Sequence, residues 1–178
     1  LTNDENIPYS LTTGKQPVKE YEKLVNEDVH KLEVFADNSY RVYGIEGGTK
    51  SSTSGSGITG GSLSGAGGNS TWTDRKVYFS SGAYSCNYYV SYVIYGDGSY
   101  SNINNVKRGS WCALFTMGSG DGLSIINRYQ TSSVPAKARL KLSQYFLNSD
   151  GSMSYLNRFE LYFQLRFSSV GVFWDMNP

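Results

Sequence analysis

Apolar and polar residues alternate along the last third of the chain in two long runs separated by a short polar segment. The apolar positions are Ala136, Ala138, Leu140, Leu142 and Phe146 in the first run, and Met153, Tyr155, Phe159, Leu161, Phe163, Leu165 and Phe167 in the second. A period of two is that of a β-strand with one buried face. A two-residue turn at Asp150-Gly151 pairs Leu140 with Leu161, and Lys141 with Glu160. A slip of one residue would break these pairs, so the segment predicts an antiparallel hairpin.

The densest run of the 15 tyrosines, between residues 83 and 95, shows the same period. One parity holds Tyr84, Cys86, Tyr88, Val90, Tyr92 and Ile94 and is mostly apolar, whereas the other parity is mixed. We therefore expect Tyr84, Tyr88 and Tyr92, together with Tyr155 of the last hairpin, to pack in the core. Tyr89 and Tyr95, like Tyr145 and Tyr162 of the last hairpin, belong to the polar faces.

Strand-like runs follow one another closely from residue 71 onwards. They cover approximately 71–80, 83–95, 99–107, 110–117, 123–130, 136–147, 152–168 and 170–174, with turn signals at Asp97-Gly98, Gly118–Gly122 and Asp150-Gly151. Short spacers favour antiparallel neighbours. The chain is therefore predicted to be a mainly β protein, an antiparallel β-sandwich or flattened barrel, in a single domain over residues 1–178.

The N-terminal part of the chain is less regular. Residues 1–16 are polar and are expected to form a loose arm. From Pro17, apolar residues recur every three or four positions, which predicts a short amphipathic helix over about 17–27, with a strand as the alternative. Residues His30–Phe35 and Ser39–Glu46 alternate around Asp37-Asn38, which predicts a hairpin. His30 is interpreted as an ordinary strand residue.

Residues 47–70 differ from the rest of the chain in composition. Nine of these 24 residues are Gly, seven are Ser and three are Thr, and Ile58 and Leu63 are the only large apolar ones. Such a segment buries too little surface to offset its backbone entropy. We expect a flexible Gly/Ser-rich surface loop within the domain.

Charge and composition restrict the possible partners and location. The formal net charge is +1 and only 17% of residues are charged, so we expect neither a basic field of the kind that attracts nucleic acid nor a patch that steers the protein to a membrane. No apolar run is long enough to span a bilayer as a helix. Low charge with abundant Ser, Thr, Tyr, Asn and Gly favours an extracellular or cell-surface location. Because the chain starts at Leu1, we expect that either a signal peptide or an added tag has been removed upstream.

The two cysteines, Cys86 and Cys112, both lie in strand-like runs. An oxidising location would allow a disulfide between them, and the alternative is two buried free thiols. No Cys/His cluster has the spacing of zinc ligands, so no metal and no cofactor is expected.

Few residues are suited to catalysis. With a single His near the N-terminus, no Ser/His/Asp arrangement can be assembled, and the nucleophile-elbow, zinc-protease and phosphate-loop motifs are missing from the sequence. Asp97, Asp121 and Asp150 stand at turn signals, where Asp is favoured for backbone reasons. The protein is therefore predicted not to be an enzyme.

Binding is the function that the composition favours. Tyr and Trp give large, stiff contact surfaces, and Ser, Gly and Asn give adaptable hydrogen bonds. The candidate ligand-binding residues are Tyr89, Tyr95, Tyr145, Tyr162, Trp72 and Trp111, the two tryptophans being expected at strand starts, partly exposed. The expected partner is a protein or a glycan. The competing interpretation of these tyrosines is ordinary cross-strand packing.

A third class of function fits part of the pattern. Alternating Ser, Tyr and Val strands beside a Gly/Ser/Thr-rich segment resemble β-pore-forming toxins, in which an amphipathic segment refolds into a transmembrane hairpin. Only Ile58, Leu63 and Ala66 in residues 47–70 would face lipid, so a membrane-active toxin is the alternative to a recognition module.

The order of several short motifs resembles a known family. These are Tyr9-Ser-Leu-Thr-Thr-Gly-Lys-Gln16, Ile45-Glu-Gly-Gly48, Arg75-Lys-Val-Tyr-Phe79, Tyr88-Tyr-Val-Ser-Tyr92, the run from Ile103 to Val106 and the final hairpin. Together they resemble a family of small secreted β-sandwich proteins of Gram-positive bacteria with no established function. The resemblance implies a fold and a location and carries no catalytic residues. The Gly/Ser segment at 47–70 and the Cys pair depart from it.

Overall fold

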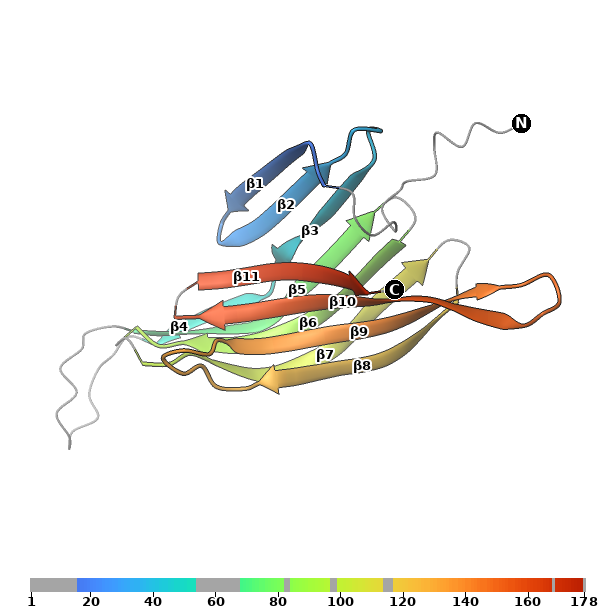
Figure 1. Cartoon of the computed structure of the whole chain (residues 1–178). Helices are drawn as coiled ribbons and strands as arrows, with labels where there is room; N and C mark the ends of the chain where they lie inside the picture. The colour runs from blue at the N-terminus through green and yellow to red at the C-terminus, as the bar shows by residue number, and fades with distance from the viewer. Residues whose placement is uncertain are drawn as a thin grey trace.

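The computed structural model describes residues 16–53, 68–81, 84–96, 99–113, 117–167 and 169–177, and all of their regular structure is β. The strands are β1 (Lys19–Val25), β2 (Asp28–Val34), β3 (Tyr40–Glu46), β4 (Thr49–Thr53), β5 (Asn69–Ser81), β6 (Tyr84–Ile94), β7 (Asn102–Ala113), β8 (Met117–Asn127), β9 (Ala136–Leu147), β10 (Met153–Arg166) and β11 (Ser169–Asn177). They form two antiparallel sheets, neither closed into a barrel, as the sequence predicted for a β-sandwich (Figure 1).

The larger sheet has seven strands in the order β1-β2-β3-β5-β6-β7, with β4 also paired to β5. Strands β3 and β4 pair with consecutive stretches of β5 and are separated by Gly47 and Gly48, which both have positive φ. Opposite this break, the register of β5 against β6 shifts between Trp72 and Arg75. The chain therefore bends in the middle of the sheet without losing its pairing.

The smaller sheet has four strands in the order β11-β10-β9-β8. The predicted register of its central hairpin is confirmed, because Leu140 pairs with Leu161 and Lys141 with Glu160. The turn itself is wider than predicted. Asn148 and Ser152 close a three-residue loop, and a bulge between Tyr155 and Asn157 restores the register.

The core lies between the two sheets and draws on one face of each. Phe79 of β5 packs against Phe159 of β10 with ring centroids 4.7 Å apart, and Tyr92 of β6 packs against Phe163 at 5.2 Å. Tyr88 and Tyr92 have no exposed surface, which confirms the expected parity of β6. The side chain of Tyr84 lies outside the described residues.

The bulge between Tyr155 and Asn157 makes the prediction of Tyr155 as a core residue wrong. Tyr155 is 51% exposed, whereas the polar Asn157 is buried. The extra residue in β10 reverses the parity between the loop and the sandwich, so side chains before the bulge face the opposite way from what an unbroken alternation implies.

The helix predicted over about 17–27 is a strand. All seven residues of β1 pair with β2, and every one of them is exposed. Because no face of β1 is buried, its apolar residues are under no constraint to alternate, and their three- and four-residue spacing is not a helical signal. The hairpin predicted at His30–Glu46 is confirmed, with Asn38 at positive φ in its turn.

Three further boundaries differ from the prediction. Both ends of the Gly/Ser-rich segment are strands, since β4 pairs with the start of β5. The middle of that segment, residues 54–67, lies outside the described residues, as do the turn at Asp97-Gly98 and the arm at 1–15. The two strands predicted over 99–107 and 110–117 are one, because β7 runs through a bulge opposite Asn87. Gly118–Gly122 is part of β8, which has a register shift there rather than a turn.

Candidate functional site

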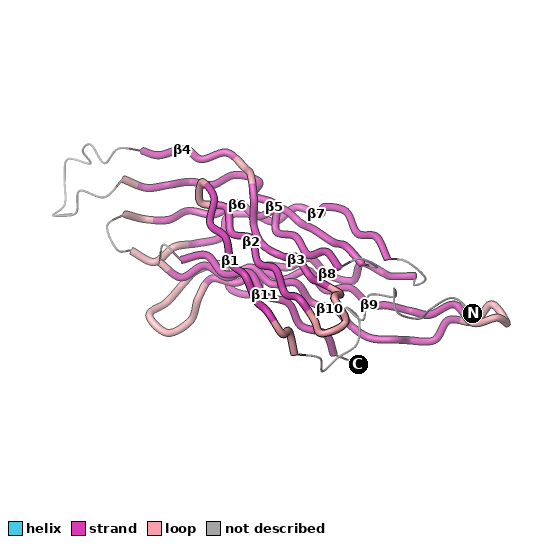
Figure 2. Tube along the Cα trace, turned by 90° about the horizontal axis from the view of Figure 1, so that it is seen from above, coloured by secondary structure: helices cyan, strands magenta, loops and turns pink. Residues whose placement is uncertain are grey.

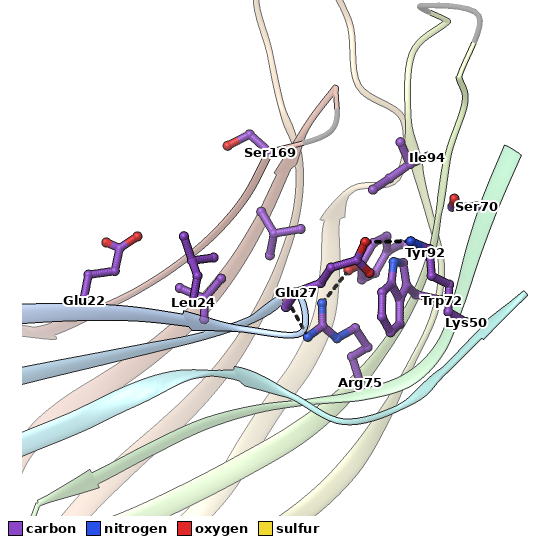
Figure 3. Close-up of a pocket in the computed structure, with 12 residues that line it drawn as sticks. Glu22, Leu24, Glu27, Lys50, Ser70, Trp72, Arg75, Tyr92, Ile94 and Ser169 are labelled. Carbon is purple, nitrogen blue, oxygen red and sulfur yellow. Dashed lines mark hydrogen bonds and ion pairs between the residues drawn. The ribbon is translucent and has the colours of Figure 1, made fainter. Parts of the chain in front are cut away.

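A groove of about 490 Å³ opens on the core-facing side of the seven-stranded sheet, where the four-stranded sheet ends (Figure 3). Its lining comes from strands that are far apart in the sequence. The lining residues are Glu22, Leu24, Glu27, Val29, Lys50, Ser70, Trp72, Arg75, Tyr92, Ile94, Ser169 and Val170. The hairpin of β1 and β2 forms one wall, and the first residues of β11 form the other.

The floor of the groove is aromatic. Trp72 of β5 and Tyr92 of β6 are cross-strand partners whose ring centroids lie 6.4 Å apart. Burial raises the pKa of Tyr92, and the neighbouring Arg75 opposes that rise. Trp72 is only 8% exposed, so its prediction as a partly exposed residue is wrong: Arg75, Lys50 and Tyr92 pack against its ring.

Arg75 lies below the aromatic floor and connects the parts of the groove through hydrogen bonds. Its side chain is 1% exposed, its guanidinium carbon lies 4.3 Å from the Trp72 ring centroid, and its Nη1 donates to the hydroxyl of Tyr92 at 3.1 Å. The other donors reach backbone carbonyls, with Nε 3.1 Å from Gly47 O and Nη2 2.9 Å from Glu27 O. Among side-chain groups, only a guanidinium has enough N–H donors, in a fixed planar arrangement, to make all of these hydrogen bonds.

An ion pair with Asp28 neutralises the buried guanidinium. The Asp28 carboxylate also accepts a hydrogen bond from the backbone N–H of Gly47 at 3.0 Å. Arg75 and Asp28 thus join three segments: the turn between β1 and β2, the break between β3 and β4, and strand β6. This network fixes the position of the hairpin wall relative to the floor.

The rim of the groove carries charges of both signs. Lys50 Nζ lies 2.6 Å from the Glu27 carboxylate and 5.4 Å from the Trp72 ring centroid, so this pair spans the mouth above the indole. Glu22 is paired with Lys31 at 3.3 Å. Leu24 is 69% exposed beside them. The groove therefore offers apolar contact mainly through Leu24 and the half-buried Ile94 and Val170, and hydrogen bonding at its edge.

The six predicted contact residues are distributed over several places. Trp72 lines the groove, and Trp111 lies near the end of β7, 40% exposed, in a smaller cavity of about 130 Å³ with Leu140 and Leu142. Tyr145 and Tyr162 share one face of the four-stranded sheet. Tyr89 lies on the outer face of the seven-stranded sheet, and the Tyr95 hydroxyl accepts a hydrogen bond from Asn102 at 2.9 Å.

The sequence prediction missed Arg75, although a signal was present. Arg75 has the same parity as Val77 and Phe79, which point into the core. An arginine on the apolar parity of a strand needs a buried partner, and that requirement points to a structured polar site.

Neither cysteine forms a disulfide. Cys86 pairs with Trp111, and Cys112 pairs with Ser85, so the two side chains leave neighbouring strands on opposite faces. Cys86 is buried and Cys112 is exposed. Of the two alternatives left by the sequence, the structure has two thiols without a disulfide, of which only one is buried.

His30 takes part in a local interaction on the outer face of the seven-stranded sheet. Its Nδ1 shares a hydrogen bond of 2.7 Å with the Tyr78 hydroxyl, across Gly44 of the intervening strand β3. Burial and nearby carboxylates raise the pKa of Tyr78 to about 12, so this phenol stays protonated at neutral pH. The described residues contain no group of three or more His, Cys, Asp or Glu side chains placed to hold a metal ion.

Comparison with known proteins adds no relative. No protein-family model, curated protein or solved structure matches this chain. Within the described residues, no helix is long and apolar enough to cross a membrane.

Proposed function

We propose that this protein is a non-enzymatic recognition module of the extracellular space or cell surface, and that it binds its ligand in the groove between the β1–β2 hairpin and the start of β11. The expected ligand is a protein segment or a glycan. The observation that carries the proposal is the Arg75 network, because it fixes an aromatic floor and a charged rim relative to each other through contacts within the protein.

Preorganisation of this kind lowers the entropic cost of binding. The hairpin wall is fixed at its turn by Arg75 and Asp28, while the Leu24 side chain and the Lys50–Glu27 pair stay accessible at the mouth. A ligand with an apolar part and hydrogen-bonding groups matches these surfaces.

The chemistry of the rim supports binding rather than catalysis. The two carboxylates that line the groove, Glu22 and Glu27, are each engaged by a lysine. A general acid or base needs a carboxyl group that is available to the substrate in the required protonation state. Neither His nor Cys is among the described residues that line the groove.

The test is a binding screen combined with a variant that fills the groove. Leu24→Arg places a long charged side chain at the mouth, and Tyr21→Arg places the same side chain on the same exposed strand but on the opposite face. A ligand found on a glycan or protein array should lose binding with Leu24→Arg and keep it with Tyr21→Arg. A blank array with an intact fold, or equal binding by both variants, would contradict the proposal.

A further inference from the structure

The outer face of the four-stranded sheet carries an excess of positive charge. Register and parity assign five cations to this face: Lys137, Arg139, Lys141, Arg158 and Arg166. Two carboxylates, Glu160 and Asp175, are the acidic members among its described side chains, so the net charge is +3. The chain as a whole has a net charge of only +1, which makes this face the site of a local concentration of charge.

The acidic residue at the centre of this face is already engaged. Glu160 is 4% exposed and lies 3.3 Å from both Arg139 and Arg158, and it accepts a hydrogen bond from the Tyr162 hydroxyl. Burial and this hydrogen bond raise the pKa of Tyr162. Glu160 thus holds the neighbouring cations in place, and its own charge is largely hidden from solvent.

Aromatic rings are interleaved with the cations. Tyr162 and Phe173 are stacked with centroids 4.8 Å apart, and Lys137 Nζ lies 4.3 Å from the Tyr162 centroid. The parity of β9 places Tyr145 on the same face. The rings of Tyr145 and Tyr155 meet edge to face, with centroids 5.9 Å apart.

The end of this face projects beyond the sandwich. The hairpin of β9 and β10 extends past the other strands as a separate arm (Figures 1 and 2). Met153 is 56% exposed and Tyr155 is 51% exposed on that arm. Both are directed there by the β10 bulge, and neither is covered by another strand of the described chain.

We infer that this outer face, which we call the cationic–aromatic face, is a docking surface for an anionic lipid membrane. Lysine and arginine are attracted to anionic headgroups, and tyrosine is enriched where headgroups meet acyl chains. The face combines both residue types, and its projecting arm adds the apolar Met153. A soluble acidic polymer would account for the cations but would leave Met153 and Tyr155 without a role. This inference is independent of the groove, which opens on the inner side of the other sheet.

The charge dependence is tested with the full chain and lipid vesicles. Vesicles of phosphatidylcholine with about 30% phosphatidylserine, in about 0.1 M salt, are sedimented with the protein, and the bound fraction is measured. The double variant Lys141→Gln/Arg166→Gln should weaken binding on the order of 20-fold. The matched control Lys19→Gln/Lys23→Gln removes the same charge from exposed β1 and should leave binding unchanged.

The apolar contribution is tested with the arm. Met153→Ser/Tyr155→Ser should weaken vesicle binding about tenfold while leaving the melting temperature close to that of the natural chain, because both side chains are exposed. Binding to heparin in parallel reports the charge alone and should not change in this variant.

Three results would overturn the inference. The first is that the folded natural chain does not bind the vesicles. The second is that it binds equally well to vesicles of phosphatidylcholine alone. The third is that it binds heparin while the Met153/Tyr155 substitutions leave vesicle binding unchanged. The last result would assign the face to an acidic polymer instead. Failure of the groove proposal would leave these measurements unaffected, since no groove-lining residue is changed.

Discussion

The seven-stranded sheet has a covered half and an uncovered half, and the two differ in what their residues do. Around β5 and β6, the core-facing side chains are buried under the four-stranded sheet, as Phe79 is between Phe159 and Trp174. The strand β1 continues the same sheet but is exposed along its whole length. Leu24 and Phe79 thus belong to the same face of one sheet, with exposed fractions of 69% and 0%.

If the proposed function is correct, the side chains that stabilise the fold and those that bind the ligand lie in different halves of one sheet. Burial of apolar side chains stabilises the covered half, whereas the uncovered half is held by the backbone pairing of β1 with β2 and by the polar network of Arg75 and Asp28. A strand held in this way keeps its side chains exposed. Substitutions confined to one half of the sheet test this difference.

The largest expected effect is in the covered half. Phe79→Ala should lower the free energy of unfolding by about 3–5 kcal/mol, because it removes a buried ring and leaves a cavity between the sheets. Leu24→Ala in the uncovered half should change it by about 0.5 kcal/mol or less. Urea unfolding measures both values. Similar losses for the two variants would show that the uncovered half is buried in solution.

The next effect concerns the network itself. Arg75→Ala leaves Asp28, the Tyr92 hydroxyl and two carbonyls without their donor, and should lower the free energy of unfolding by about 3 kcal/mol.

Hydrogen exchange should locate the damage caused by Arg75→Ala. The amides of β1 and β2 should exchange faster, while those of β9 and β10 follow only the global change in stability. Arg75→Lys should rescue little, since an ammonium group cannot reach all four acceptors. Unchanged relative protection of β1 and β2 would show that Arg75 does not hold the hairpin.

A smaller effect is expected at the break between β3 and β4. A Cβ on Gly48 would lie 2.7 Å from Arg75 Cγ and 2.8 Å from Thr73 O, and Gly48 has a φ of +83°. Gly48→Ala should therefore destabilise by about 2 kcal/mol. Gly47→Ala is the matched control, since its φ is +64° with no atom within 4 Å, and it should destabilise by about 1 kcal/mol. Thermal unfolding compares the two; a reversed order would contradict the packing of Gly48 against Arg75.

The smallest effect is a pH dependence at the tip of the β9–β10 hairpin. The Asp150 carboxylate accepts hydrogen bonds from the Ser152 hydroxyl at 2.6 Å and from its N–H at 2.9 Å, and these hold the pKa of Asp150 below its usual value. Stability from such a carboxyl is present above its unfolded pKa, about 3.9, and is lost as pH falls through the lower folded pKa.

Consequently, between about pH 5 and pH 2, the melting temperature should fall slightly less for Asp150→Asn than for the natural chain. Asn retains the turn geometry and does not titrate, which makes it the appropriate control for the local hydrogen bonds. Parallel curves of melting temperature against pH for the two proteins would show that Asp150 does not contribute to the loss of stability in acid.

The sequence was most informative where a strand buries one face. The register of Leu140 with Leu161 could be predicted because a slip would have moved every apolar side chain into water. The same reasoning placed Tyr88 and Tyr92 in the core. It failed for β1, whose two faces are both exposed and whose residues therefore carry no periodic signal.

The groove was less predictable than the sheets because its residues meet only in three dimensions. Trp72 could be proposed from its residue type, but its burial depends on β4, which lies in a Gly/Ser-rich segment that composition alone assigns to a loop. The position of Arg75 among the apolar residues of its strand indicated a buried polar site. The identity of its partners, however, depends on where the turn at Glu27-Asp28 meets the break at Gly47. No local pattern encodes that meeting.

The bulge in β10 has a consequence for how such a chain can change during evolution. One additional residue between Tyr155 and Asn157 places a tyrosine at the surface and an asparagine inside, with no change in the rest of the strand. Because Tyr145 and Gln144 are adjacent on β9, deletion of the extra residue would make the pairing continuous and leave Tyr155 outside and Asn157 inside. A single genetic event could therefore change the length of the strand at this point while the arm keeps its exposed aromatic residues and the sandwich below it keeps its core.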